Sequence, residues 1–155
     1  MLFRSAMERA LSDGVDWAII FEDDAEVPSN LLERINSALE GFSLSHNSIP
    51  RVVWLDERNH PEGYGIIPGC CVSGVLYHRS AMEVLARDMY WPNSELLQRY
   101  RNHTFFPKNI IHHDDCLYDW ALANIVSHRN IVGASVRLVS SGAFDSVARP
   151  GEDEK

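Results

Sequence analysis

The chain has 155 residues, of which 45% are hydrophobic and 23% charged, a composition typical of one soluble domain with a sizeable core. Its formal net charge of −8 argues against a general nucleic-acid-binding protein, which would carry basic patches. A phosphate-bearing substrate is still compatible with this charge, because a metal ion would mediate the contact.

The N-terminal segment does not have the features of a secretory signal. Arg4, Glu8 and Arg9 interrupt it, so it has no continuous apolar stretch. No apolar run approaches the ~20 residues that a membrane-spanning helix needs. The sequence therefore predicts a protein with no signal peptide and no membrane span.

The three cysteines predict a reducing environment. Cys70 and Cys71 are adjacent and Cys116 is the third, so the count is odd and no Cys-x-x-Cys or Cys/His zinc spacing exists. We expect reduced, structural thiols and a cytoplasmic location.

The first third of the chain predicts two helices and two strands. Apolar residues at helical spacing predict a helix over 2–12, and a short bounded apolar run predicts a buried strand over 17–21. A second helix is expected over about 29–41, with Gly41 just past its end. A second strand is expected over 51–55.

The remainder continues this alternation. Residues 58–68 have little periodicity and predict a long loop. A strand is expected over 70–77, followed by a helix over 79–89. A strong helix over 116–126 precedes a final strand or strand pair over 130–139.

Strands that alternate with helices predict an α/β layered domain. Residues 1–147 show no internal repeat or linker, so we expect one domain. The segment 148–155 is charged and contains Pro and Gly, which predicts a disordered tail.

Three carboxylates directly follow the first predicted strand: Glu22, Asp23 and Asp24. Acids clustered at a strand end repel one another unless water, a cation or a partner offsets their charge. Ligands of open α/β sheets bind outside the carboxyl ends of strands, and carboxylate oxygens suit Mg²⁺ or Mn²⁺. The alternatives are a metal–phosphate site and a solvated acidic turn.

Two further clusters of ionisable residues have alternative interpretations. Asp56 and Glu57 follow the second predicted strand and favour a simple strand end. Residues 112–115, His-His-Asp-Asp, precede a helix, so either acid would cap it. In a functional site, one Asp would act as general base and a His would bind metal or diphosphate. Gly74 favours close approach of a ligand or another backbone.

Four stretches, in this order, resemble glycosyltransferase family 25, the lipopolysaccharide and collagen sugar-transferase group. The acidic stretch Phe-Glu-Asp-Asp-Ala-Glu-Val-Pro at 21–28 is similar to the acidic motif of GT-A glycosyltransferases. The stretch 70–85 is similar to the family's Gly-rich strand followed by a Ser/Arg-Ala helix, and 114–119 to its acidic pair opening a helix. Residues 136–146 are similar to its later strand and Ser-containing segment.

The resemblance implies a GT-A-like, Rossmann-like three-layer fold with a mixed sheet. Family members carry an N-terminal βαβ portion before the acidic strand, whereas about sixteen residues precede Trp17 here. The implied fold is therefore N-terminally shortened. Asp24 would contact a divalent metal and the donor diphosphate, Glu22 would complete the metal site, and Asp23 would orient the donor.

The same resemblance implies roles for the later cluster. Asp114 or Asp115 would be the catalytic base or acceptor-orienting acid. His112 would join the metal ligands, and His113 would lie beside the nucleotide diphosphate. The implied activity is Mn²⁺- or Mg²⁺-dependent transfer of a sugar, favoured as a UDP-sugar, to a glycan or other hydroxyl acceptor, as in lipopolysaccharide biosynthesis.

Two alternatives use the same residues. The first is a degenerate, non-catalytic GT-A-like domain that binds a glycan or a protein partner. The second is another metal-dependent phosphotransfer or hydrolase domain.

Overall fold

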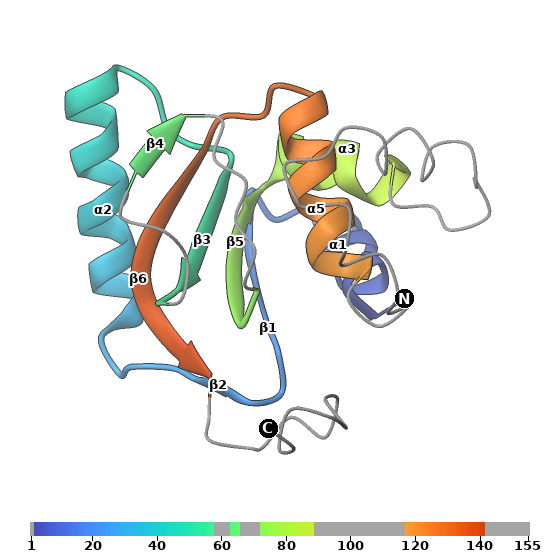
Figure 1. Cartoon of the computed structure of the whole chain (residues 1–155), viewed down its shortest axis with the longest axis horizontal. Coiled ribbons are helices and arrows are strands. Elements are labelled where there is room, and N and C mark those ends of the chain that lie inside the picture. Colours follow the sequence, from blue (N-terminus) through green and yellow to red (C-terminus); the bar gives the residue numbers. More distant parts are fainter. Residues whose placement is uncertain (1, 58–62, 66–71, 89–116, 142–155) are drawn as a thin grey trace, which may run out of the picture.

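The computed structural model describes residues 2–57, 63–65, 72–88 and 117–141 (Figure 1). The helices are α1 (Leu2–Ser12), α2 (Leu31–His46), α3 (Arg79–Asp88) and α5 (Leu117–His128). The strands are β1 (Trp17–Phe21), β2 (Ala25–Glu26), β3 (Val52–Asp56), β4 (Gly63–Gly65), β5 (Gly74–His78) and β6 (Gly133–Ser141).

The six strands form one open, mixed sheet with the order β1-β5-β3-β6-β2, and β4 also pairs with β6. β3 and β6 are parallel, whereas β5 is antiparallel to both β1 and β3. β2 and β4 are antiparallel to β6. It follows that β1, β3 and β6 run in one direction and end at the same edge of the sheet.

Helices cover both faces of the sheet, as Figure 1 shows. On one face, α1, α3 and α5 pack on a core that includes Met7, Trp54, Tyr77, Leu85 and Ile125. On the other, α2 packs on a core that includes Leu31, Ile35, Val53, Leu55 and Leu76. The prediction of an α/β layered fold with a mixed sheet is confirmed at this level.

β3 is the central strand of this arrangement, because all five of its residues are buried. Val52 and Trp54 face the three-helix side, and Val53 and Leu55 face α2. An apolar residue at every position is typical of a strand covered on both faces. The sequence predicted this strand to within one residue.

The predicted end of the second helix was wrong. α2 continues past Gly41 to His46, and Asn47 ends it in the left-handed conformation, with φ of 50° and its N–H donated to the Ser43 carbonyl at 2.9 Å. The His46 ring stacks on the Tyr64 ring of β4, with centroids 4.0 Å apart. This contact, distant in sequence, stabilises the last helical turn beyond the glycine.

The other differences are small. β2 was not predicted, since two residues give no periodicity, and β4 lies inside the segment predicted as a loop. The final strand is single and runs to Ser141. The predicted tail 148–155 lies outside the described residues.

A buried carboxylate joins α3 to the end of α5. The Asp88 residue is only 7% exposed, and it accepts hydrogen bonds from Nε of Arg129 at 2.6 Å and Nε of Arg87 at 3.0 Å. Burial raises the pKa of Asp88, but the hydrogen bonds and positive charges of Arg129 and Arg87 outweigh it, so the pKa lies below its usual value.

Candidate functional site: an acidic edge of the sheet

The candidate site lies at the edge where β1, β3 and β6 end and β5 begins. Asp56 is the last residue of β3, and Glu22 directly follows β1. β5, which begins at Gly74, lies between these two strands in the sheet. The segment just before β5 therefore separates the two carboxylates, and its last residue is Ser73.

Ser73 joins Asp56 to Glu22. Its backbone N–H donates to Oδ2 of Asp56 at 3.3 Å, and its hydroxyl donates to Oε2 of Glu22 at 3.4 Å. Its carbonyl accepts the Glu22 backbone N–H at 3.0 Å. Asp56 and Ser73 are completely buried, each with an exposed fraction of 0%. One serine thus fixes the positions of two carboxylates that lie 34 positions apart in the sequence (56 − 22).

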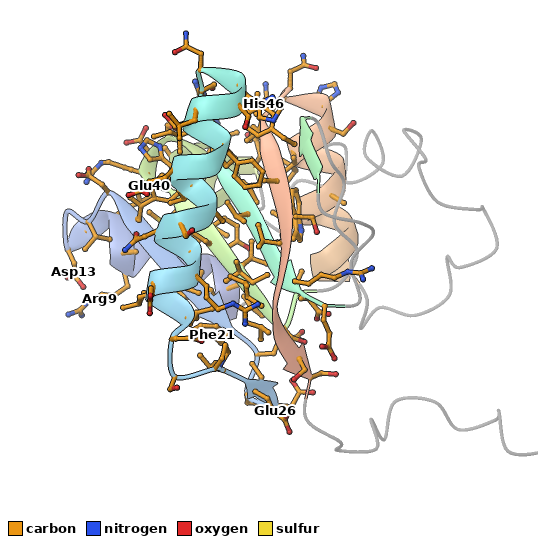
Figure 2. The ribbon with its side chains drawn as sticks, turned by 90° about the vertical axis from the view of Figure 1, so that its left-hand side faces the viewer. Arg9, Asp13, Phe21, Glu26, Glu40 and His46 are labelled. Atoms are coloured by element: carbon orange, nitrogen blue, oxygen red, sulfur yellow. The ribbon has the colours of Figure 1, made fainter. Side chains whose placement is uncertain are left out.

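The segment after β1 carries the remaining acids across this edge. A tight turn follows β1, in which the Ala25 N–H donates to the Glu22 carbonyl at 3.2 Å. β2 then pairs with the last residues of β6, so β5, β3 and β6 lie between β1 and β2 in the strand order. Figure 2 shows Phe21 and Glu26 at the end of the sheet near which α2 begins, and His46 at the other end of α2.

Within this crossing segment the acids differ in environment. Asp23 is exposed and Asp24 is half-buried. Glu26 is exposed and accepts a hydrogen bond from the Ser140 hydroxyl at 3.2 Å, which fixes the crossing segment to β6. Asp23 and Asp24 therefore lie between two serine-anchored glutamates.

The first residue of β5, Gly74, is tightly packed beside the candidate site. A Cβ atom at this position would lie 3.1 Å from ring carbons of Phe21 and 3.3 Å from Cγ2 of Val139. The sequence predicted close approach of a ligand or another backbone at this glycine, whereas the atoms that approach it in the structure belong to these two side chains.

The two described segments that carry the acids of this edge contain no positively charged residue. Residues 17–27 and 52–57 contain six carboxylates and no lysine or arginine. Clustering acids at a partly buried edge is costly unless a cation or hydrogen-bond donors offset it. Ser73 and Ser140 donate hydrogen bonds to acids of this cluster, and a divalent cation that prefers oxygen ligands is chemically compatible with it.

The part of the chain that the structure describes does not contain a complete set of metal ligands. Among the described residues, no group of three or more His, Cys, Asp or Glu side chains is arranged to hold a metal ion. Mg²⁺ is usually held by one or two carboxylates together with water and substrate phosphates. Glu22 and Asp24 would supply such a pair, and phosphate oxygens would complete the coordination.

The structure brings some of the predicted site residues together. Glu22, Asp23 and Asp24 follow β1 at the expected edge. Asp56, which the sequence favoured as a simple strand end, belongs to the same edge. Glu57 is exposed, and its backbone N–H donates to the Val139 carbonyl at 2.9 Å.

The other predicted site residues lie outside the described part of the chain. These are His112, His113, Asp114 and Asp115. The three cysteines, which we expected to be structural thiols, also lie outside it. The helix that the His-His-Asp-Asp segment precedes is present as α5, on the three-helix face.

Sequence reasoning missed Ser73 and Ser140 as site residues. A serine beside a glycine or within a strand carries no sequence signal for such a role. Their roles follow from sheet pairing between segments more than fifty positions apart.

None of the helices in the ranges that the structure describes is long and apolar enough to cross a membrane.

No protein-family model matches the chain. Comparison with curated proteins and with solved structures likewise found no match. The function is therefore argued from the acidic edge itself.

Proposed function

We propose that the chain is a divalent-metal-dependent glycosyltransferase domain of the GT-A type, similar to glycosyltransferase family 25. It would transfer a sugar from a nucleotide-sugar donor, favoured as a UDP-sugar, to a hydroxyl group of a glycan or another acceptor. The observation that carries the proposal is the acidic edge at which Ser73 joins Glu22 to Asp56.

The position and chemistry of this edge support the proposal. In open α/β sheets, ligands bind outside the carboxyl ends of the strands, where Glu22, Asp24 and Asp56 lie. A donor diphosphate is negatively charged, so it would be repelled by these acids in the absence of a cation. A bound Mn²⁺ or Mg²⁺ would offset both sets of charges and stabilise the departing diphosphate.

The residues of the chain would have distinct roles in this reaction. Glu22 and Asp24 would hold the metal, and Ser73 would fix the Glu22 carboxylate through its hydroxyl. Asp23, which is exposed, would orient the donor through water. By resemblance, His112 and His113 would complete the metal and diphosphate contacts.

The transfer itself would form one bond and break one. The acceptor oxygen bonds to the anomeric carbon of the sugar, and the bond from that carbon to the diphosphate oxygen breaks. The acceptor hydroxyl proton passes to a carboxylate base, for which Asp114 or Asp115 is the candidate by resemblance. The bonding electrons leave with the nucleotide diphosphate.

Calorimetric titration with UDP, in the presence and absence of Mn²⁺, tests the proposal. We expect UDP to bind only with Mn²⁺, and we expect Asp24→Asn to weaken this binding by about 10-fold or more, the loss typical of impaired metal sites. Asp16→Asn is the matched control, because Asp16 is an exposed acid at the other end of β1.

Two results would contradict the proposal. The first is the absence of UDP binding at millimolar concentration with saturating Mn²⁺, which would favour a non-catalytic domain. The second is release of inorganic phosphate from simple phosphoesters without sugar transfer, which would favour a hydrolase.

A further inference from the structure

The outer edge of β1 is open in the described part of the chain. β1 is the terminal strand of the sheet order and pairs there with β5 alone. The hydrogen bonds at its two ends fix which of its backbone groups face β5. Arg79 N–H donates to the Asp16 carbonyl at 2.7 Å, and Glu22 N–H donates to the Ser73 carbonyl at 3.0 Å.

In an antiparallel pair, hydrogen-bonded positions alternate along each strand. The even-numbered residues from Asp16 to Glu22 therefore face β5 with their N–H and C=O groups. The backbone groups of Trp17, Ile19 and Phe21 point away from β5, toward the open edge. This edge thus presents three N–H donors and three C=O acceptors at the spacing of a strand ladder.

Within the described residues, β1 lacks the charge, proline and bulge that often protect an edge strand. Its sequence, Trp-Ala-Ile-Ile-Phe, contains no charge and no proline, and its register with β5 is regular. All five residues are only half-buried, whereas all five residues of β3 are buried. An apolar, regular edge strand is a template for pairing with another strand.

The charges around β1 indicate what kind of strand it would accept. Exposed Asp16 precedes it, and Glu22 and exposed Asp23 follow it. The Arg79 backbone pairs with Asp16, but its guanidinium donates to the Leu11 carbonyl at 3.5 Å and lies 3.5 Å from the Glu83 carboxylate. Both ends of the open edge are therefore acidic.

This charge pattern disfavours a second copy of the chain as the occupant. Antiparallel pairing of two β1 strands centred on Ile19 would set Asp16 of one copy opposite Glu22 of the other. Like charges directly opposite each other destabilise a strand pair. A strand with basic residues at both ends would instead be attracted at both ends.

We propose that the open edge of β1 binds an extended segment of a partner protein. This segment has a short β-forming core bracketed by Lys or Arg, and it adds a strand to the sheet. Backbone groups of Trp17, Ile19 and Phe21 would supply the ladder hydrogen bonds, and Asp16 and Asp23 would pair with the flanking cations. The proposal is independent of UDP binding and of sugar transfer.

Amide hydrogen exchange by NMR tests the proposal, with Lys-Arg-Val-Thr-Val-Thr-Val-Arg-Lys as the probe peptide. In the free protein, the Trp17, Ile19 and Phe21 amides should exchange faster than those of Ala18 and Ile20. The peptide should slow exchange at the three odd-numbered amides. The same peptide with Asp in place of each Lys and Arg is the control and should have no effect.

Two variants separate backbone pairing from charge. Ile19→Pro removes an outward N–H, at a position where an edge strand tolerates proline, and should weaken peptide binding by about 10-fold. Asp16→Lys keeps the backbone unchanged and should also weaken binding. Equal affinity of wild type and Asp16→Lys would overturn the charge argument.

Other outcomes would overturn the proposal as a whole. If the three odd-numbered amides are already protected in the free monomer, another part of the chain covers the edge. If protection rises with protein concentration and Ile19→Pro abolishes a dimer, the occupant is a second copy. Absence of peptide binding at millimolar concentration would contradict a basic partner strand, whatever the result of the UDP titration.

Discussion

Replacing Gly133 by alanine should destabilise the protein through a single misplaced methyl group. Gly133 lies opposite Val52 in the parallel pair of β6 and β3. A Cβ atom at this position would lie 2.6 Å from Cζ3 of Trp54 and 3.2 Å from the Val52 carbonyl oxygen. Trp54 is completely buried, so its ring has no free space into which to move.

The expected loss of unfolding free energy in Gly133→Ala follows from this geometry. A carbon–carbon contact at 2.6 Å is about 1 Å shorter than the optimal separation, so the ring or the strand must shift. Overpacking of this kind costs about 1–3 kcal/mol of unfolding free energy. For a domain of 155 residues, each kcal/mol corresponds to a decrease of about 2–4 °C in Tm.

Gly41→Ala is the matched control, because the same methyl group should there have the opposite effect. Gly41 lies inside α2 and is exposed, with no atom within 4 Å of the added Cβ. Alanine is favoured over glycine in a helix, so we expect stabilisation of about 0.5–1 kcal/mol. Urea denaturation of both variants provides the measurement.

A stability of Gly133→Ala within about 0.5 kcal/mol of wild type would refute the reasoning. It would mean that Gly133 does not face Trp54, and hence that the β3–β6 register is different. The register shifts between Trp54 and Asp56, so this variant tests the pairs from Val52–Gly133 to Trp54–Ser135 and not the pairing of Asp56 with Val139.

Three further changes test other parts of the structure. Asp88→Asn should destabilise the protein by about 1–2 kcal/mol at pH 7, because the carboxylate is buried against two arginines. The pKa of Asp88 is lower in the folded state than in the unfolded state, where it is about 3.9. The stabilisation by the Asp88 carboxylate is therefore complete above about pH 3.9 and is lost as the pH falls through the folded-state pKa. Denaturation curves of wild type and variant should therefore converge in acid, and a difference that does not depend on pH would contradict this. Ser73→Ala should weaken Mn²⁺-dependent UDP binding by about 3- to 10-fold through loss of the hydroxyl donor to Glu22. The exposed serine Ser45, near the far end of α2, is the control, and Ser45→Ala should leave this binding unchanged. Equal affinities of Ser73→Ala and wild type in calorimetry would contradict the role of Ser73. Asn47→Ala should lower the unfolding free energy by about 1 kcal/mol, because alanine is strained at the φ of 50° that Asn47 adopts. Asn47→Gly should not, because glycine tolerates this conformation. An equal loss of stability in both variants would argue against the left-handed cap.

The elements that the sequence predicted well are those whose local pattern and burial agree. β1 and β3 are short apolar runs bounded by polar residues, and α3 has an apolar face that the sheet covers. In β3 and α3 the residues that define the pattern also form the core. β1, which the sequence predicted as a buried strand, is half-buried along its whole length because it is the terminal strand of the sheet. Local spacing was therefore enough to predict their type and approximate bounds.

The end of α2 was not predictable from local pattern alone. Gly41 resembles a helix stop, but it lies on an exposed helix face. Phe42 and His46 continue the helix because both rings contact Tyr64, which belongs to β4. The true stop is Asn47, whose side chain tolerates the left-handed conformation.

The candidate site was predictable only in part, for a similar reason. Three acids after a buried strand predicted a site at Glu22, Asp23 and Asp24. That Asp56 joins them depends on the placement of β5 between β1 and β3, and on Ser73 at the start of β5. Neither the strand order nor this hydrogen bond follows from the local sequence of any segment.

The paramagnetism of Mn²⁺ provides the most direct test of the central claim, that the acidic edge binds a divalent cation together with UDP. In NMR spectra of the protein with UDP, substoichiometric Mn²⁺ should selectively broaden the amide signals of Glu22, Asp24 and Ser73. The signals of Asp16 and Asn47, which lie away from this edge, should remain sharp. Broadening centred elsewhere, or none that depends on UDP, would contradict the proposed site.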